Sequence, residues 1–448
     1  MDEGRPLTTA TTETALSSKV RWTIVGLLSA SIMINLLDRQ ILSVLAAELR
    51  NAFHWSNAQY GYIAVSFNLG MMVGQIPSGA LMDRVGTRIG LPLIFIGWSM
   101  IGLLHAFAGP GTAIDAAATA ILGAIPGLPV LAAGLAGFLF LRFFMGVTEC
   151  GNYTAGIKAL AGLFPAATRS RAGGMFNAGA QFGSVIAPPI VVFLASRFDW
   201  RMAFILPPIV TMLWLLPWFA TFPDKRRMDA IAVKPAGAVL ATAPAMSIGR
   251  LIRNHKVLGL LLIRVFSGPI TTFYWTWLPL YLRTGRGMSF LALGFFASIP
   301  NLIGMSGNVV GGLLTDRFLK MTGSVDRGRK LAFSCAFGLG ALSMTMPWVS
   351  NNYLAVVLMG LALFGNQWYA ATYIGTVGDV VPQHLAGRVN GIAGLGDNGA
   401  ALLAVLYTGV VVDKYGWTPV FIGAGMMPFM AMLSLFLVLR KIEPARFD

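Results

Sequence analysis

The amino-acid sequence predicts an all-α membrane protein with twelve transmembrane helices, in two six-helix halves related by pseudo-two-fold symmetry. Three observations lead to this prediction: the apolar composition, the number of long apolar runs, and a motif that occurs once in each half. Of the 448 residues, 56% are hydrophobic and 11% are charged, and the mean hydropathy is +0.70. Because soluble domains carry about 25% charged residues, this composition excludes an ordinary soluble enzyme.

Twelve runs are long enough to cross a bilayer, which takes about 20 mostly apolar residues. In the N-terminal half we expect spans at 22–48, 58–81, 89–109, 131–163, 172–195 and 202–222. In the C-terminal half we expect them at 257–282, 288–314, 329–349, 352–380, 387–412 and 417–440. The fourth run is the longest of the first six, so we expect that helix to be tilted or to project beyond the bilayer.

Residues 106–130 are apolar enough to resemble a thirteenth span. Asp115 and the Gly and Pro residues around it argue against a continuous helix there. A thirteenth span would also invert every later loop. We therefore expect a long outer loop, with a short helix on the membrane surface that either covers the outer mouth or is a tolerated insertion.

The distribution of positive charge predicts the topology. Of the 33 Lys and Arg residues, 23 fall in segments that are cytoplasmic if the N-terminus is inside, and only 6 fall in outer loops. This is the positive-inside bias, and it places both termini in the cytoplasm. The net charge of +15 is thus a topology signal, and we expect no nucleic-acid partner. Residues 1–20 lack an apolar core, so we expect no cleavable signal peptide.

A polar linker and a repeated motif divide the chain in two. Residues 223–256 are rich in charge and contain Pro235 and Pro244, so we expect a cytoplasmic linker, with a short amphipathic helix between Met246 and Lys256. The expected organisation is listed here: tail 1–21, N-terminal half 22–222, linker 223–256, C-terminal half 257–440 and tail 441–448.

The repeat is Gly-x3-Asp-Arg, at equivalent places in the two halves. It comprises Gly79, Asp83, Arg84 and the nearby Arg88 after the second span, and Gly312, Asp316 and Arg317 after the eighth. Gly allows a neighbouring helix to approach closely, and Asp can cap the next helix or pair with an Arg across the loop. Such paired repeats are found in transporters built from two similar halves.

Four charged residues lie deep inside the N-terminal half: Asp38, Arg39, Arg142 and Glu149. Intramembrane charges are costly and are usually kept where they are paired or face a wet cavity. Arg142 and Glu149 are two helical turns apart, on one face and separated by about 10 Å of axis. The set predicts a site that binds an anion and handles a proton, with a static set of salt bridges as the alternative.

Further polar residues lie in the other spans. Asp397 is a third intramembrane acid, and it is either a second proton site or a hydrogen-bond partner of Asn398 and water. The remaining candidates for ligand contacts, each with helix packing as the alternative, are Asn177, Gln181, Tyr274, Trp277, Gln367 and Asn398. Lys158 and Arg264 lie near the cytoplasmic ends of their spans, where we expect long side chains to reach the interface.

Other kinds of chemistry have no motif in the sequence. There is no P-loop, no metal-ligand spacing and no nucleophile with a supporting triad, so we expect no catalytic residues, no metal and no cofactor. The two cysteines, Cys150 and Cys335, lie in different halves and are expected to be free thiols. An ion gradient would then supply the energy for transport. We expect a monomer whose partners are protons, a small organic anion and the lipid bilayer.

Short motifs along nearly the whole chain carry a resemblance to a known family. They are Asp38-Arg39, Gln75-Ile-Pro77 before Asp83-Arg84, Arg142-x3-Gly146-x2-Glu149, Phe164-Pro165 with Arg169, Ala187-Pro188-Pro189, Asp199-Trp200-Arg201, and Asp379-x2-Pro382 with Gly387, Asn390 and Gly391. Together they resemble the major facilitator superfamily and, within it, the anion:cation symporter group that includes sugar-acid transporters.

The resemblance implies proton-coupled uptake of hexonates, hexarates or hexuronates across a bacterial inner membrane by alternating access. Arg39 would hold the substrate carboxylate, Asp38 and Glu149 would be protonation sites, and Arg142 would pair with one of them. The chain departs from relatives at Leu36 and near Met71, where they often have Tyr, and at Asp397, where they tend to have a small residue. An organic-anion exchanger or exporter, and a ligand sensor that does not transport, are the alternatives.

Overall fold

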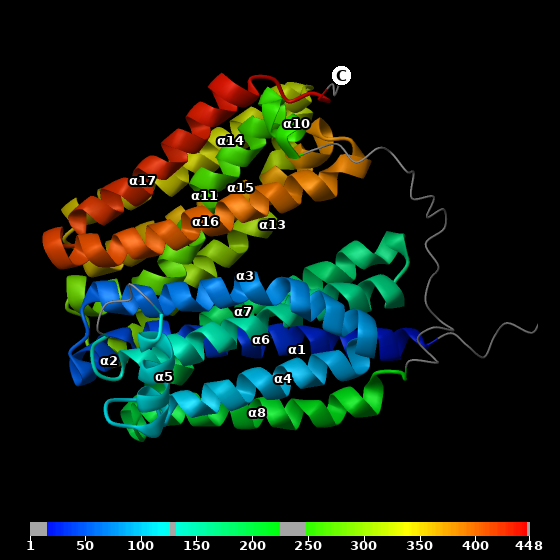
Figure 1. Cartoon of the computed structure of the whole chain (residues 1–448). Coiled ribbons are helices and arrows are strands. Elements are labelled where there is room, and N and C mark those ends of the chain that lie inside the picture. The colour runs from blue at the N-terminus through cyan, green and yellow to red at the C-terminus, as the bar shows by residue number, and fades with distance from the viewer. Residues whose placement is uncertain (1–15, 126–130, 225–247, 446–448) are drawn as a thin grey trace, which may run out of the picture.

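Helices make up nearly all of the computed structural model, which describes residues 16–125, 131–224 and 248–445 (Figure 1). The N-terminal half contains six long helices: α1 (Ser18–Val44), α3 (Asn57–Val85), α4 (Thr87–His105), α6 (Leu135–Leu163), α7 (Ala166–Arg197) and α8 (Trp200–Thr221). The C-terminal half contains six more: α11 (His255–Leu280), α13 (Ser298–Thr322), α14 (Val325–Gly340), α15 (Asn352–Val380), α16 (Gln383–Tyr415) and α17 (Thr418–Leu433).

Shorter elements extend or connect the long helices. They are α2 (Ala46–Phe53), α5 (Ala113–Gly123), α10 (Ile248–Arg253), η1 (Tyr281–Gly285), α12 (Phe290–Phe296), η2 (Ala341–Trp348) and η3 (Ser434–Leu439). The helix α10 lies within the expected segment from Met246 to Lys256. Most of the expected linker and the outermost residues of both tails fall outside the described residues.

The twelve expected spans correspond to the twelve long helices. Ten of the helices in the described part of the chain are long and apolar enough to cross a membrane by length and composition alone. The other two, α3 and α6, carry more polar residues, and α6 holds the charged Arg142, Glu149 and Lys158. The two helices that resemble ordinary spans least are therefore the ones that carry much of the candidate site.

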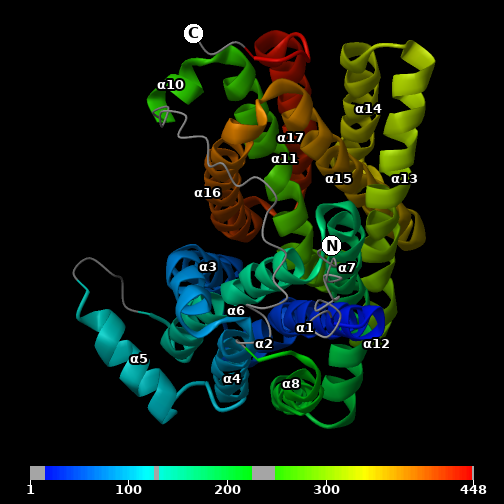
Figure 2. The ribbon, with the colours of Figure 1, turned by 90° about the vertical axis from the view of Figure 1, so that its right-hand side faces the viewer.

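The segment predicted to be an outer loop contains the short helix α5. Its Asp115 accepts hydrogen bonds from the backbone N–H groups of Gly134 and Gly137, at 2.8 and 3.0 Å, and so satisfies amides at the start of α6. Figures 1 and 2 show α5 on the flank of the N-terminal half rather than between the halves. This position does not support the alternative in which the loop covers the mouth.

Glycines allow the long helices to pack with their backbones close together. A side chain at Gly70 of α3 would collide with the carbonyl oxygen of Phe143, and one at Gly146 of α6 would collide with that of Phe67. Small residues at helix contacts are typical of membrane proteins, where packing replaces the hydrophobic effect between helices. Glycines on both helices, among them Gly70 and Gly146, thus fix the close α3–α6 contact, and this holds α6 against the cavity described below.

The two halves touch at one end and diverge at the other (Figure 1). We call the end at which α1 begins and η3 ends the terminal side, and the end at which α1 ends and α3 begins the opposite side. Near the opposite side, Arg283 of η1 pairs with Glu48 of α2 at 3.2 Å, and the hydroxyl of Tyr60 donates to the carbonyl of Thr276. The structure is therefore closed toward the opposite side, with the helix ends spread apart on the terminal side.

Candidate functional site

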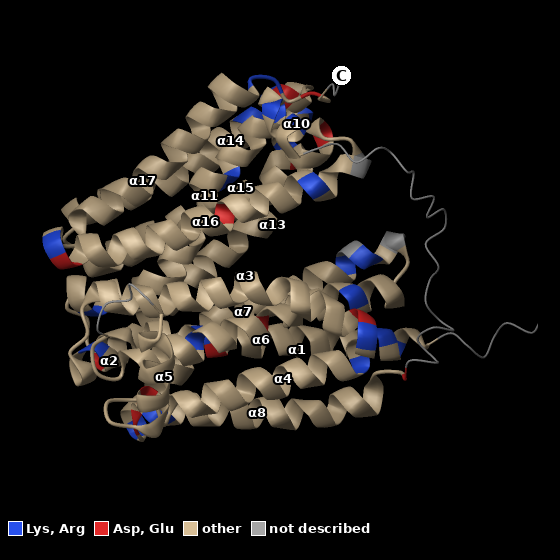
Figure 3. Cartoon of the chain, in the orientation of Figure 1, with Lys and Arg blue, Asp and Glu red and all other residues tan. Residues whose placement is uncertain are grey.

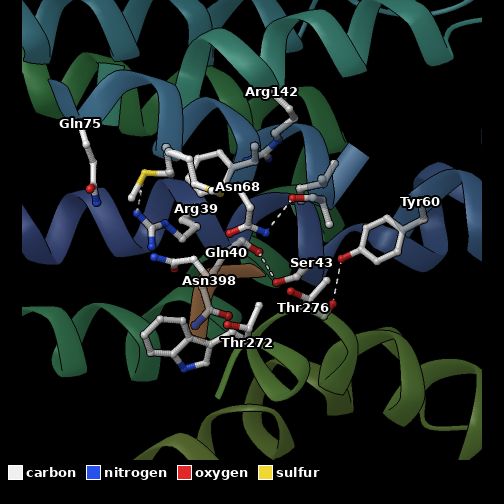
Figure 4. Close-up of a pocket in the computed structure, with 16 residues that line it drawn as sticks. Arg39, Gln40, Ser43, Tyr60, Asn68, Gln75, Arg142, Thr272, Thr276 and Asn398 are labelled. Carbon is white, nitrogen blue, oxygen red and sulfur yellow. Dashed lines mark hydrogen bonds between the residues drawn. The ribbon is translucent and has the colours of Figure 1, made fainter. Parts of the chain in front are cut away.

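A cavity of about 250 Å³ lies between the two halves (Figure 4). This volume is just below the usual range for small-molecule sites, about 300–1,000 Å³. The N-terminal half supplies polar groups from α1, α3 and α6, among them Arg39, Gln40, Ser43, Tyr60, Asn68, Gln75 and Arg142. Across from Arg39, the C-terminal half supplies Thr272, Trp275 and Thr276 from α11 and Asn398 from α16.

Arg39 joins the cavity wall to a buried acid. Its Nε and NH2 atoms lie 3.4 and 3.3 Å from Oε2 of Glu149, and its guanidinium lies 4.9 Å from the centre of the Phe67 ring. The side chain of Arg39 is 25% exposed, whereas that of Glu149 is fully buried. A ligand in the cavity therefore reaches the arginine directly and the carboxylate only by way of the arginine.

Asp38 and Arg142 are buried beside this pair. Neither oxygen of Asp38 has a hydrogen-bond partner among the described residues, and the same is true of Nε and NH2 of Arg142. The resemblance implied that Arg142 pairs with one of the acids, but the structure pairs Glu149 with Arg39 instead. Buried charges without partners are costly, so this arrangement favours a site completed by a ligand or a proton over a static packing device.

Several amides around these charges also lack partners in the described structure. They are the side-chain nitrogens of Asn35, Gln40 and Asn152. Gln40 lines the cavity beside Arg39, while Asn152 accepts a hydrogen bond from Ser31 through its oxygen. These groups, together with Ser43, Asn68 and Thr276, were not among the sequence candidates. For Asn35 and Ser43 the available signal was a polar residue four positions from Arg39 on the same membrane helix, and for the others it was only a polar residue in an apolar run.

The C-terminal half contains a second intramembrane ion pair. Nε of Arg264 on α11 lies 3.1 Å from Oδ2 of Asp397 on α16. The sequence left Asp397 as a proton site or a partner of Asn398, and placed the end of Arg264 at the interface. In the structure the two residues pair with each other, while the neighbouring Asn398 lines the cavity.

Five of the residues that the sequence suggested for ligand contacts do not line this cavity. Tyr274 bonds to the hydroxyl of Ser343 at 2.7 Å, and Trp277 packs edge-on against Tyr60. The side-chain oxygen of Gln367 accepts from Asn308, and Asn177 donates to the carbonyl of Gly173 in its own helix. Gln181 lies in the middle of the same helix, α7. Their proposed ligand contacts remain predictions.

The repeated motifs lie at the terminal-side ends of α3 and α13. Asp83 pairs with Lys158 of α6 at 2.7 Å, so in this conformation it neither caps the next helix nor pairs with an Arg. The expectation that the Lys158 side chain reaches the interface stays a prediction. Side chains at Gly79 and Gly312 would meet nothing within 4 Å, so neither glycine supports a close helix contact in this conformation. The other motif residues are Arg84, Asp316 and Arg317, which are exposed, and Arg88, which donates to the carbonyl of Phe219.

Metal-binding chemistry has no site in the described part of the chain. There, no group of three or more His, Cys, Asp and Glu residues is arranged to hold an ion. Cys150 and Cys335 are free thiols, as the sequence predicts.

Twelve long helices around a polar cavity between two halves define a multi-pass membrane transporter rather than an enzyme. The chain belongs to the Major Facilitator Superfamily, because the family model matches residues 28–325 and 321–447. This confirms the fold and the family that the sequence motifs indicated.

Individual relatives agree with this assignment. The chain is 28% identical to the probable galactarate/D-glucarate transporter GudP of Bacillus subtilis (strain 168), over 95% of this chain and 93% of that protein. It is also 28% identical to the hexuronate transporter of Escherichia coli (strain K12), over 95% of each chain. Among solved structures, it resembles a bacterial homologue of the human lysosomal transporter Spinster in an inward-facing conformation, with a TM-score of 0.72, 15% identity, and coverage of 95% of this chain and 98% of that one.

Proposed function

We propose that the protein is a proton-coupled symporter that takes up a sugar acid: a hexonate, hexarate or hexuronate. The observation that carries the proposal is the Arg39–Glu149 pair, in which a cavity-facing cation is held by a fully buried carboxylate. The names of the two sugar-acid transporters similar to this chain support the substrate class. An arginine is suited to this task because its planar donor groups match a carboxylate in two places.

The pair couples the anion to the proton by exchange of partners. When a substrate carboxylate binds Arg39, Glu149 loses its counter-charge while it remains buried. A buried carboxylate without a counter-charge is costly, and binding a proton removes that charge. Substrate and proton therefore bind together and leave together. When both have left, Arg39 and Glu149 pair again, as they do in this structure.

Asp38 is the second proposed proton site. It lies next to Arg39 in the sequence, but on a helix the two side chains point about 100° apart. Asp38 consequently faces the interior of the N-terminal half, near Arg142, while Arg39 faces the cavity. The N-terminal half therefore contains two arginines that can bind the substrate carboxylate and two acids that can bind the proton, all in one group of side chains.

Alternating access would expose this site to each side of a bacterial inner membrane in turn. We assign the terminal side to the cytoplasm, because Lys and Arg gather at the helix ends on that side (Figure 3). On this assignment both termini are cytoplasmic and the structure is the inward-open state. The contacts near Glu48 and Tyr60 would then close the periplasmic entrance.

Uptake into proteoliposomes tests the proposal. The purified protein is first screened by thermal shift against sugar acids and their neutral parent sugars, because a ligand of the native state raises its stability. Radiolabelled D-glucarate, D-glucuronate and D-gluconate are then offered with an acidic outside, with and without a protonophore. Accumulation that the protonophore abolishes supports symport. Exchange without accumulation would instead mean an exchanger, and binding without transport would mean a sensor.

A further inference from the structure

The Arg264–Asp397 pair is partly open to its surroundings. The side chains of Arg264 and Asp397 are 31% and 22% exposed, and they meet through Nε and Oδ2 at 3.1 Å. The guanidinium also lies 5.7 Å from the centre of the Tyr373 ring. Arg264 thus has a counter-ion and an aromatic neighbour, and it keeps surface through which another anion can approach.

Arg264 lies on the face of α11 that lines the cavity. Counted along the helix, Trp275 is 11 residues after Arg264 and Thr272 is 8 residues after it, which places them about 20° and 80° around the axis from it. Both of these residues line the cavity that contains Arg39. Arg264 is therefore on the same side of α11, about 12 Å along the axis from Thr272 toward the terminal side.

Asp397 connects the pair to the cavity from α16. It directly precedes Asn398, which lines the cavity opposite Arg39. Its carboxylate occupies the space above Gly268, where any larger side chain would collide with it. The glycine that accommodates Asp397 is one helical turn from the cavity-lining Thr272, so the second ion pair adjoins the cavity wall.

Buried hydroxyls around the pair add to its capacity for an anion. The hydroxyls of Ser267 and Tyr373 are buried and have no hydrogen-bond partner among the described residues. Ser267 lies on α11 three residues after Arg264, and Tyr373 lies on α15, with its ring beside the Arg264 guanidinium. Hydroxyl groups donate to carboxylates, so the surroundings of Arg264 suit a bound carboxylate as well as they suit Asp397.

A purely structural role accounts for this arrangement less well. The helices α11 and α16 already pack closely, with Val265 against Gly396 and Gly268 against Asp397. An ion pair in the membrane has a desolvation cost that an apolar contact of the same size avoids. A ligand-binding group must be partly exposed and must lie on the cavity face of α11. An ion pair that only holds two helices together needs neither property.

We propose that Arg264 is a second anion-binding residue and that Asp397 is the counter-ion it exchanges for a carboxylate of the ligand. Arg39 and Arg264 belong to opposite halves, and in this structure each is paired with an acid of its own half. A ligand with two carboxylates replaces both acids, whereas a ligand with one replaces only Glu149. The inference rests on the proposed function and narrows its substrate class to six-carbon dicarboxylates, the hexarates.

Two substitutions with opposite expected effects test this assignment. Arg264→Gln removes the binding group, so the Kd for D-glucarate should rise about tenfold, as expected for the loss of a charge-assisted hydrogen bond. Asp397→Asn removes the competing carboxylate, so the Kd for D-glucarate should fall. Neither change should alter the Kd for the monocarboxylate D-gluconate by more than about twofold. Binding is measured on the purified full-length protein by ligand-induced thermal stabilisation and by competition with radiolabelled ligand.

Arg329→Gln is the matched control, because Arg329 forms an Arg–Asp pair of similar geometry with Asp379, at 3.0 Å, in the same half. The Arg329→Gln substitution should change the Kd for D-glucarate and the Kd for D-gluconate by the same factor. If Arg264→Gln and Asp397→Asn weaken the binding of D-glucarate and D-gluconate to the same extent, the pair only holds α11 and α16 together and the assignment is overturned. If Arg264→Gln does not fold, Asp397→Asn decides alone: unchanged or weaker D-glucarate binding overturns the assignment. Wild-type protein that binds no sugar acid overturns the proposed function itself, which is a distinct result.

Discussion

Asp413 of α16 caps the first turn of α3 through Asn57, across the boundary between the two halves. Its Oδ1 accepts hydrogen bonds from the backbone N–H and the side-chain amide of Asn57, at 2.9 and 2.7 Å, and its Oδ2 accepts from the backbone N–H of Ala58 at 2.8 Å. Carboxylates are favourable at helix N-termini, where backbone donors lack partners. One half thus supplies the cap for a helix of the other in this conformation, which is closed on the opposite side.

Asp413→Asn should shift the protein toward the conformation that is open on the opposite side. The substitution removes the negative charge that faces the helix N-terminus, and an exposed interaction of this kind is worth on the order of 1 kcal/mol. The population of that open conformation should rise about fivefold. The measurement is labelling of Thr276→Cys, a cavity residue, by a membrane-impermeant thiol reagent added from the opposite side, in a background with Cys150 and Cys335 replaced by Ser.

Asp199→Asn is the control for this shift. Asp199 also lies on the opposite side, but it pairs with Arg201 of its own half, at 3.0 Å. The Asp199→Asn substitution should leave the labelling rate of the cysteine at position 276 unchanged. Equal labelling rates in Asp413→Asn and the parent protein would show that the cap does not contribute to closure.

The helices and the charged centre were predictable from the sequence because their signals are strong. An apolar run of about 20 residues is typical of a transmembrane helix. An acid or arginine within such a run is rare and therefore easy to identify. The Asp38-Arg39 and Arg142–Glu149 motifs therefore indicated a group of intramembrane charges, and the structure has the Arg39–Glu149 pair in that group. The roles of these residues in binding and coupling stay predictions. The exact pairing was not predictable, because the sequence does not determine which of two nearby arginines reaches Glu149.

The face that each helix presents to the cavity was much harder to predict. In α11, Trp275 lines the cavity, whereas its neighbours Tyr274 and Trp277, the residues selected from the sequence, are buried elsewhere. In soluble proteins, polarity distinguishes the inner face of a helix from the outer one. In a membrane both lipid and protein interior are apolar, so that distinction is weak and the cavity face of an aromatic-rich helix depends on tertiary packing.

Gly146→Ala should destabilise the protein through the contact between α3 and α6. The added methyl group would collide with the carbonyl oxygen of Phe67, so the helices must move apart. Overpacking of this kind costs about 1–3 kcal/mol, which should lower the unfolding temperature measurably. Gly79→Ala on α3 is the control, since a side chain there meets nothing within 4 Å and alanine favours a helix. Identical unfolding temperatures for the two variants would contradict the packing argument.

Arg39→Ala should weaken the binding of sugar acids strongly, because it deletes the cavity-facing partner of the substrate carboxylate. A charge-assisted hydrogen bond contributes about 1.5–3 kcal/mol, so the Kd should rise at least about tenfold. Arg39→Lys should recover part of the affinity, since lysine keeps the charge but not the two-pronged geometry. Affinities are read from thermal stabilisation by D-glucuronate.

Because Arg39→Ala also leaves Glu149 buried without a partner, the same comparison is made in a Glu149→Gln background. There the acid is neutral, and a loss of affinity on removing Arg39 reports the substrate contact alone. Unchanged affinity in that background would exclude Arg39 as the carboxylate-binding residue.

Glu149→Gln should abolish proton-driven accumulation while counterflow exchange continues. Glutamine has the shape of the protonated acid but carries no exchangeable charge, so the variant behaves as if the coupling proton were always bound. In the wild type, substrate binding takes up a proton, so affinity should rise as the pH falls; in the variant this dependence should weaken by about one proton. Asp199→Asn, which changes an exposed acid on the opposite side, should accumulate substrate normally. Normal accumulation by Glu149→Gln under a pH gradient would show that the buried partner of Arg39 is not the coupling residue, and would leave Asp38 to carry the proton.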